Sequence, residues 1–145
     1  MNHFEVIEHV VTHLAQQKVR ATENGNRDCL YRVFDEDHNA TAKCAAGCMI
    51  PDSLYDPSME GQNLELVMAN FQDVREYFRD LCPNSHLDET KNLLKRLQNI
   101  HDSTPVEDWP KAFYYFAMGT HSLTFASKVI QIFRSHGWEN TTIVG

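Results

Sequence analysis

Apolar side chains recur at intervals of three and four residues along five segments of this chain. This spacing constrains the fold more than any other feature, because it places apolar residues on one face of an α-helix. The pattern predicts helices over residues 3–20, 64–81, from 85 or 86 to about 100, 105–118 and 123–136. The most regular stripe consists of Leu64, Val67, Phe71, Val74, Phe78 and Leu81.

Proline and glycine indicate where these helices start and stop. Residues 104–107, Thr-Pro-Val-Glu, have the form of a capping box with proline at the first helical position. We expect Pro110 to kink or split the helix that follows, because proline removes a backbone donor. Gly119 is expected to end that helix, and Gly137 to follow the last one.

A short β-hairpin is predicted between the first two helices. Residues 29–34 are aromatic and β-branched, and residues 35–39 are typical of a turn. Residues 40–44 are then expected to form the second strand. Prolines and glycines divide residues 45–61 into turns or single helical turns. The expected class is α+β, mainly α, with about five helices around one core and a small β-hairpin near residues 29–44.

The 145 residues suit a single domain spanning 1–145, since no repeat or linker divides them. The first residues lack the pattern of a secretory signal, and no apolar run approaches the ~18 residues of a membrane span. We therefore expect a cytoplasmic protein that does not contact membranes.

The formal net charge of −7 is unevenly distributed. Residues 28–80 hold eleven acidic and four basic side chains, and the remaining residues balance. A basic surface for binding phosphates is therefore not expected, and direct nucleic-acid binding is not predicted. The acidic middle third is instead a candidate surface for a basic patch on another protein, although charge runs are also usual on solvated faces. Its candidate binding residues are Asp35, Glu36, Asp37, Asp52, Tyr55, Asp56 and Glu60.

Four consecutive aromatic residues, 113–116, cannot all face one side of a helix. Most are expected in the core, with Tyr114 or Tyr115 bridging to another helix. The alternative is that one of these tyrosines is an interface anchor.

The cysteines are expected to be thiols rather than disulfides in a reducing compartment. Cys29, Cys44 and Cys48 are weak candidates for a zinc site, because their spacing lacks a close Cys-x-x-Cys pair. No cofactor is otherwise expected. His101 and Asp102 offer a metal or acid–base pair, but a histidine near a helix end more often bonds the last carbonyls. His9 and His13 share the helix face opposite the apolar stripe, where solvated histidines are the expectation.

The segment Lys43–Asp52, Lys-Cys-Ala-Ala-Gly-Cys-Met-Ile-Pro-Asp, is followed by Tyr-Asp-Pro-Ser-Met-Glu-Gly at 55–61. In these residues the chain resembles small uncharacterised proteins of bacteriophages and prophages. The resemblance implies a phage-type accessory protein acting in the cytoplasm of a bacterial host, and assigns no residue a role.

The leading functional hypothesis is an acidic viral protein that binds a host protein and modulates or inhibits it, such as a component of a defence or nucleic-acid-processing complex. No catalytic signature favours an enzyme. One alternative is a small metal protein or enzyme that uses Cys44, Cys48, His101 and Asp102. A second alternative is a small-ligand sensor with a pocket between the hairpin and the helices.

Overall fold

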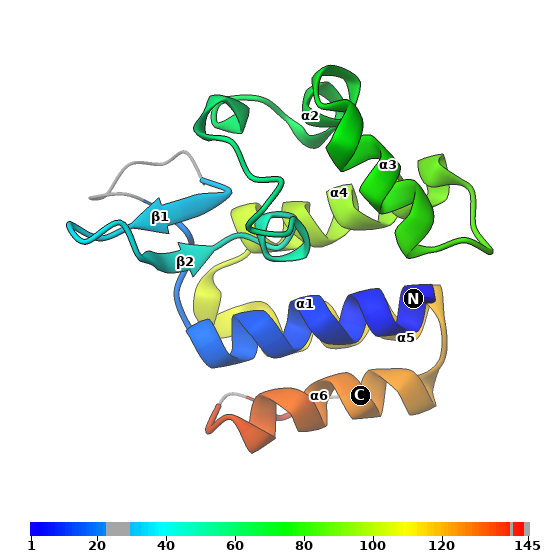
Figure 1. The fold of residues 1–145 in the computed structure, drawn as a ribbon. Helices are drawn as coiled ribbons and strands as arrows, with labels where there is room; N and C mark the ends of the chain where they lie inside the picture. Colours follow the sequence, from blue (N-terminus) through cyan, green and yellow to red (C-terminus); the bar gives the residue numbers. More distant parts are fainter. Residues whose placement is uncertain (23–29, 140, 144–145) are drawn as a thin grey trace.

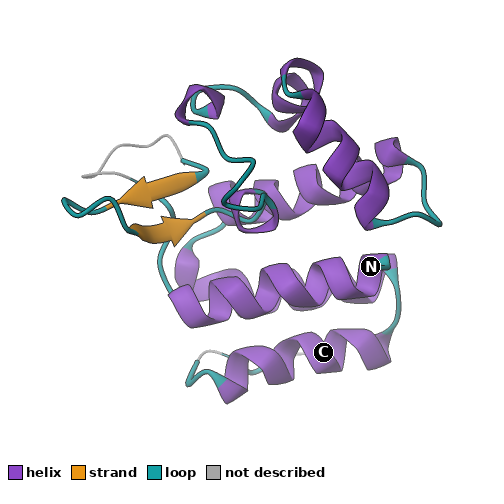
Figure 2. Cartoon of the chain, viewed as in Figure 1, coloured by secondary structure: helices purple, strands orange, loops and turns teal. Residues whose placement is uncertain are grey.

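The computed structural model describes residues 1–22, 30–139 and 141–143. They form six α-helices, three short 3-10 helices and a two-stranded antiparallel sheet (Figures 1 and 2), which confirms the α+β, mainly α class. The elements are α1 (His3–Gln17), β1 (Arg32–Phe34), β2 (Ala40–Lys43), η1 (Gly47–Met49), η2 (Pro57–Met59), α2 (Leu64–Asn70), α3 (Gln72–Leu81), α4 (Leu87–Ser103), η3 (Val106–Asp108), α5 (Trp109–Thr120) and α6 (Leu123–Ser135).

Four helices surround the main core. α1 and α5 each pack against both α4 and α6, and the two short helices α2 and α3 lie over α4 (Figure 1). Trp109, Phe113 and Phe133 are fully buried at the centre, where the last two rings stack with centroids 6.1 Å apart. Burial of apolar and aromatic surface supplies the main driving force for this arrangement. None of the helices in the described ranges is long and apolar enough to span a bilayer.

The predicted hairpin is confirmed within the described residues. β1 and β2 pair antiparallel, with Arg32 opposite Lys43 and Val33 opposite Ala42. The register then shifts, so that Phe34 lies opposite Ala40. The extra residue in β2 is typical of a β-bulge, which increases the local twist. The hairpin extends from the C-terminal end of α1 as a narrow arm (Figure 1).

The first helix is three residues shorter than the predicted 3–20. Asn2 caps its start, where the Asn2 side chain accepts from the Glu5 amide and the Glu5 side chain accepts from the Asn2 amide. Lys18 adopts a left-handed conformation and ends the helix. Arg20 then donates hydrogen bonds to the carbonyls of His101 and Thr104. This contact with the end of α4 requires the chain to leave the helix earlier than periodicity alone indicates.

The single helix predicted over 64–81 is wrong, because Phe71 divides it into α2 and α3. Phe71 is extended, with φ −119° and ψ 94°. The side chain of Arg75 donates to the carbonyl of Met68, which the break leaves without a helical partner. The apolar stripe continues through both helices, but the break lets each of them pack against α4 along a different direction.

The helix predicted over 105–118 is split, as expected, but not at the predicted residues. η3 precedes α5, and Pro110 occupies the first turn of α5, where its missing N–H costs no hydrogen bond. The predicted capping box does not form, since Pro105 precedes η3 without a side-chain cap. Gly119 lies inside α5, whose last residue is Thr120, so the predicted stop at Gly119 is also wrong.

The remaining elements follow the sequence pattern. α4 begins after His86, and α6 ends next to His136 and Gly137, whose φ is +84°. The segment between β2 and α2 contains two single-turn 3-10 helices, as proline and glycine predicted.

Candidate functional site

The turn of the hairpin carries the first three residues of the predicted acidic surface. The Oδ1 atom of Asp35 accepts the backbone N–H groups of Asp37 and Asn39, both at 2.9 Å. The Asp35 amide donates to the Asn39 carbonyl at 2.9 Å, and His38 adopts a φ of +64°. Such aspartate side-chain bonds stabilise turns locally. The turn is therefore an ordered structure rather than a loose connection.

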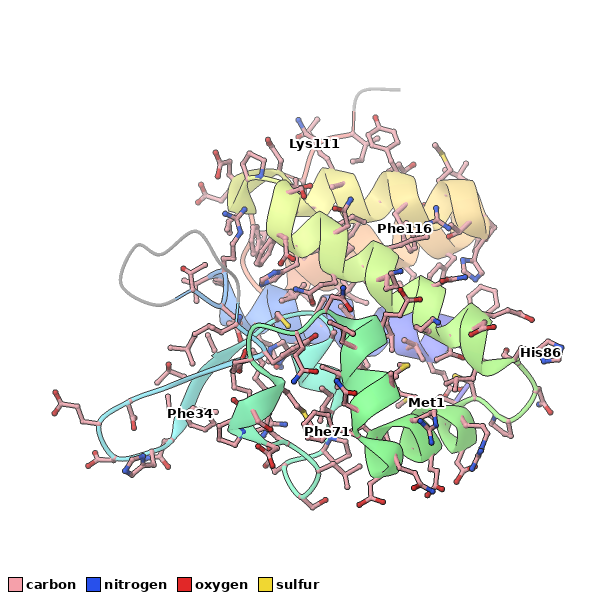
Figure 3. All side chains as sticks on the ribbon, turned by 90° about the horizontal axis from the view of Figure 1, so that it is seen from above. Met1, Phe34, Phe71, His86, Lys111 and Phe116 are labelled. Carbon is pink, nitrogen blue, oxygen red and sulfur yellow. The ribbon has the colours of Figure 1, made fainter. Side chains whose placement is uncertain are left out.

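This ordered turn presents negative charge to solvent. Asp35, Glu36 and Asp37 are exposed, and none of the ion pairs among the described residues includes them. Phe34 lies beside them on the hairpin (Figure 3) and is 42% exposed. Its ring centroid is 5.8 Å from that of Tyr55. We refer to residues 34–37 as the acidic tip.

Three other predicted binding residues converge on Arg32 instead. The buried Arg32 guanidinium donates to Asp52 at 2.6 Å and lies over the Tyr55 ring at 4.6 Å from its centroid. The Glu60 carboxylate accepts the N–H groups of Tyr31 and Arg32 and the hydroxyl of Tyr55. Because these contacts occupy both Glu60 oxygens, this carboxylate holds the hairpin against the segment before α2.

The pKa values of the acidic groups reflect these contacts. Lys43 and Arg32 lower the pKa of Asp52 by favourable charge interaction. Asp56 caps η2, and its bonds from the Ser58 amide and hydroxyl lower its pKa. Burial and the bond to Glu60 raise the pKa of Tyr55. Asp52 and Asp56 are therefore ionised and already engaged within the chain.

The two candidate interface tyrosines differ in exposure. Tyr114 is buried at 8% exposure, whereas Tyr115 is 45% exposed, and their rings meet edge to face at 5.4 Å. The Tyr114 ring is therefore part of the core and not of the accessible surface. Tyr115 is the more exposed member of the pair.

Two cysteines of the candidate zinc site, Cys44 and Cys48, each make a local hydrogen bond to the backbone. Cys44 Sγ accepts the Gly47 amide at 3.2 Å, and Cys48 Sγ donates to the Ala45 carbonyl at 3.1 Å. Burial raises the pKa of Cys44 and raises that of Cys48 to about 12. Cys29 lies outside the described residues. Within the described ranges, no three His, Cys, Asp or Glu side chains are grouped for a metal ion.

His101 and Asp102 form a close pair at the end of α4. His101 is fully buried and stacks on Trp109 with ring centroids 5.3 Å apart. Its Nε2 atom faces the Ala21 amide at 3.4 Å, so that nitrogen accepts and Nδ1 donates to Asp102 at 2.7 Å. The imidazole thus joins α4 to the chain after α1 and does not reach solvent.

A cleft of about 600 Å³ lies between the start of the hairpin, the segment 60–64 and α4. Its α4 wall consists of Lys95, Gln98, Asn99 and Asp102. The small-ligand sensor, the second functional alternative, requires a pocket between the hairpin and the helices, but the sequence did not identify these residues as its wall. Their spacing of three and four residues places them on one face of α4, so this polar stripe in the sequence could have indicated the cleft wall.

The structure thus brings Asp52, Tyr55 and Glu60 together around Arg32. Phe34 of the acidic tip contacts Tyr55, whereas the three tip carboxylates take no part in these bonds. Lys91 and Lys95 interact with Glu65 elsewhere, on the helices. No protein-family model matches the chain, and neither curated proteins nor solved structures show significant similarity to it.

Proposed function

We propose that the chain is a phage-type accessory protein that binds a bacterial host protein and modulates or inhibits it, with the acidic tip as its docking element. The observation that carries this proposal is the ordered hairpin turn with three exposed carboxylates that take part in no ion pair among the described residues. The resemblance of residues 43–61 to phage and prophage proteins supplies the bacterial context.

The charge of the acidic tip selects the kind of partner. Three adjacent carboxylates attract a basic surface and accelerate its diffusional encounter, an effect that salt screens. The other candidate carboxylates, Asp52 and Glu60, are neutralised or bonded within the chain and contribute less to such attraction. The expected partner is therefore a host protein with a lysine- or arginine-rich patch.

Phe34 supplies an apolar contact next to this charge. Aromatic side chains, phenylalanine included, are enriched in the buried centre of protein–protein interfaces. Because Phe34 is the last residue of β1 and lies opposite Ala40, its backbone is held by the hairpin ladder. Preorganisation of this kind reduces the entropy lost on binding.

The test is affinity capture from bacterial lysate at several salt concentrations with the full chain as bait. Glu36→Gln combined with Asp37→Asn removes two charges and preserves side-chain size. We expect this double variant to retain on the order of one tenth of the partner at low salt. Phe34→Ala should weaken capture at every salt concentration, because an apolar contact is not screened.

The matched control is Asp88→Asn combined with Glu89→Gln, which removes an adjacent acidic pair from the exposed start of α4. It should capture the partner as the unmodified chain does. Recovery of no stoichiometric protein at low salt, or equal loss in both double variants, contradicts the proposal.

A further inference from the structure

The cleft beside α4 contains a carboxylate, Asp102, whose position is fixed and whose second oxygen has no hydrogen-bond partner among the residues that the structure describes. Asp102 Oδ1 accepts from His101 Nδ1 at 2.7 Å and from Gln98 Nε2 at 2.8 Å. Gln98 is itself held, since its Oε1 accepts the Ala46 amide at 2.8 Å. Asp102 Oδ2 accepts no hydrogen bond from any residue that the structure describes, and the Asp102 side chain is 40% exposed.

The other polar groups of the cleft are largely committed to the fold. The Glu60 oxygens bond the Tyr31 and Arg32 amides and the Tyr55 hydroxyl, and the Tyr31 hydroxyl donates to the Gln62 carbonyl. These bonds keep the walls rigid without consuming Asp102 Oδ2. A rigid wall with one open acceptor favours binding of a donor, because little ordering is needed when the ligand arrives.

The charges of the lining indicate the sign of the ligand. Among the described lining residues, Glu60 and Asp102 are acidic and Lys95 is basic, with Lys95 Nζ 3.9 Å from Glu65 Oε2. An anion would therefore meet net negative charge beside Asp102. A cationic donor instead gains a charge-assisted hydrogen bond, which is stronger than a neutral one.

The geometry of the open oxygen distinguishes between cation types. A guanidinium prefers to bond both oxygens of a carboxylate, and here Oδ1 already accepts two hydrogen bonds. An ammonium is a compact point charge that one oxygen can accept. The cleft also offers Leu30 and Leu64 as apolar surface, and its volume of about 600 Å³ exceeds what an ammonium group alone occupies.

From this geometry we propose that the cleft binds a small primary ammonium compound, with its nitrogen on Asp102 Oδ2 and its apolar body against Leu30 and Leu64. This site is distinct from the acidic tip, and it makes the chain a receptor for a small molecule as well as a docking protein. Gln98 and His101 act as positioning residues that hold the carboxylate.

The test is a titration of the ¹⁵N-labelled full chain, at constant ionic strength, with butylammonium, cyclohexylmethylammonium and phenethylammonium chloride. We expect saturable amide shifts confined to residues 60–64 and 95–102 for at least one of these ions. The neutral 2-phenylethanol should bind at least about tenfold more weakly than phenethylammonium, and 3-phenylpropanoate should not bind.

Asp102→Asn tests the carboxylate directly, because asparagine keeps an oxygen for Gln98 but carries no charge. Its affinity for the ammonium ions should fall on the order of tenfold, whereas the control Asp88→Asn on the same helix should bind as the unmodified chain does. Absence of localised shifts with all three ions overturns the proposal, as does equal binding of 2-phenylethanol. Binding of the ammonium ions by Asp102→Asn with undiminished affinity also overturns the proposal. The acidic-tip variants should leave these amide shifts unchanged. Failure of ammonium binding at the cleft can therefore be distinguished from failure of protein docking at the acidic tip.

Discussion

At the scale of single residues, Gly47 permits a close approach between the chain at Tyr31 and the segment after the hairpin. A Cβ atom at this position would overlap the backbone carbonyl of Tyr31. Backbone atoms cannot move aside as a flexible side chain can, so the clash requires β1 and η1 to separate. Cys44, whose amide donates to the same carbonyl at 3.3 Å, would be displaced as well.

We therefore expect Gly47→Ala to lower the free energy of unfolding by about 3 kcal/mol, as overpacking in a dense interior does. The measurement is urea unfolding followed by circular dichroism. Gly119→Ala is the control, because Gly119 lies in α5 with nothing within 4 Å of the added Cβ. It should leave stability unchanged or raise it by up to about 1 kcal/mol, since alanine favours helix. Equal stability of both variants would show that the chain around Tyr31 adjusts freely.

At the scale of elements, side chains from outside the ribbon cover both edges of the hairpin. Glu60 accepts the N–H groups of Tyr31 and Arg32 on the β1 side. On the β2 side, the side-chain amide of Gln17 bonds both backbone groups of Lys43. Its Oε1 atom accepts the Lys43 N–H at 2.8 Å, and its Nε2 atom donates to the Lys43 carbonyl at 2.9 Å. Gln17 thereby replaces the missing strand and protects an edge that would otherwise be open to association.

Replacing Gln17 by alanine should leave the Lys43 N–H and carbonyl without these partners. We expect a loss of about 1–2 kcal/mol in the free energy of unfolding and faster hydrogen exchange at the Lys43 amide. Native-state hydrogen exchange monitored by NMR measures both effects. Gln16→Ala, at the exposed neighbouring position on α1, is the matched control and should alter neither. Unchanged exchange at Lys43 in Gln17→Ala would contradict this role.

The elements also show why sequence periodicity misplaces some boundaries. The stripe through residues 64–81 is continuous, so it contains no sign of the break at Phe71. The break arises because α2 and α3 both pack against α4, and one straight helix has a single direction. Likewise, α1 ends at Gln17 because the chain must bring Arg20 to the end of α4. The two carbonyls that Arg20 contacts there lie 81 and 84 positions further along the sequence.

At the scale of the whole molecule, stability should decrease on mild acidification. Burial lowers the pKa of His13 from 6.5, although its bond to the Lys43 carbonyl opposes this, and burial also lowers the pKa of His121. The unfolded chain then binds protons more readily than the folded chain as the pH falls from about 6.5 towards the lowered values. Below 6.5 the free energy of unfolding therefore falls with decreasing pH, and above it these two groups contribute no dependence.

Urea unfolding at pH 7.5 and at pH 5.5, compared between the unmodified chain and His13→Gln, measures this effect. Glutamine keeps a donor for the Lys43 carbonyl but does not titrate, so His13→Gln should lose less stability at the lower pH. NMR titration of the His13 ring provides an independent reading. A ring that titrates at or above 6.5 in the folded protein would contradict the expectation.

Some candidate sites depend on contacts between neighbours in the sequence, and others depend on contacts between residues far apart. The acidic tip was predictable, because Asp35 to Asn39 form a turn through bonds among themselves. The roles of Asp52, Tyr55 and Glu60 were not, since Arg32 brings them together from positions 20 to 28 residues away. The cleft depends on segments near residues 31, 60 and 98, which only the tertiary structure brings together.

The sequence by itself determined that the chain is mainly helical, that a hairpin follows the first helix, and that the turn of this hairpin carries negative charge. Each of these depends on neighbours within a few positions, where backbone preference and apolar spacing act directly. The tertiary structure alone decided the end of α1, the break at Phe71, the internal use of Glu60 and the fixed carboxylate of Asp102. Those features follow from contacts between residues far apart in the chain, and local patterns carry no record of such contacts.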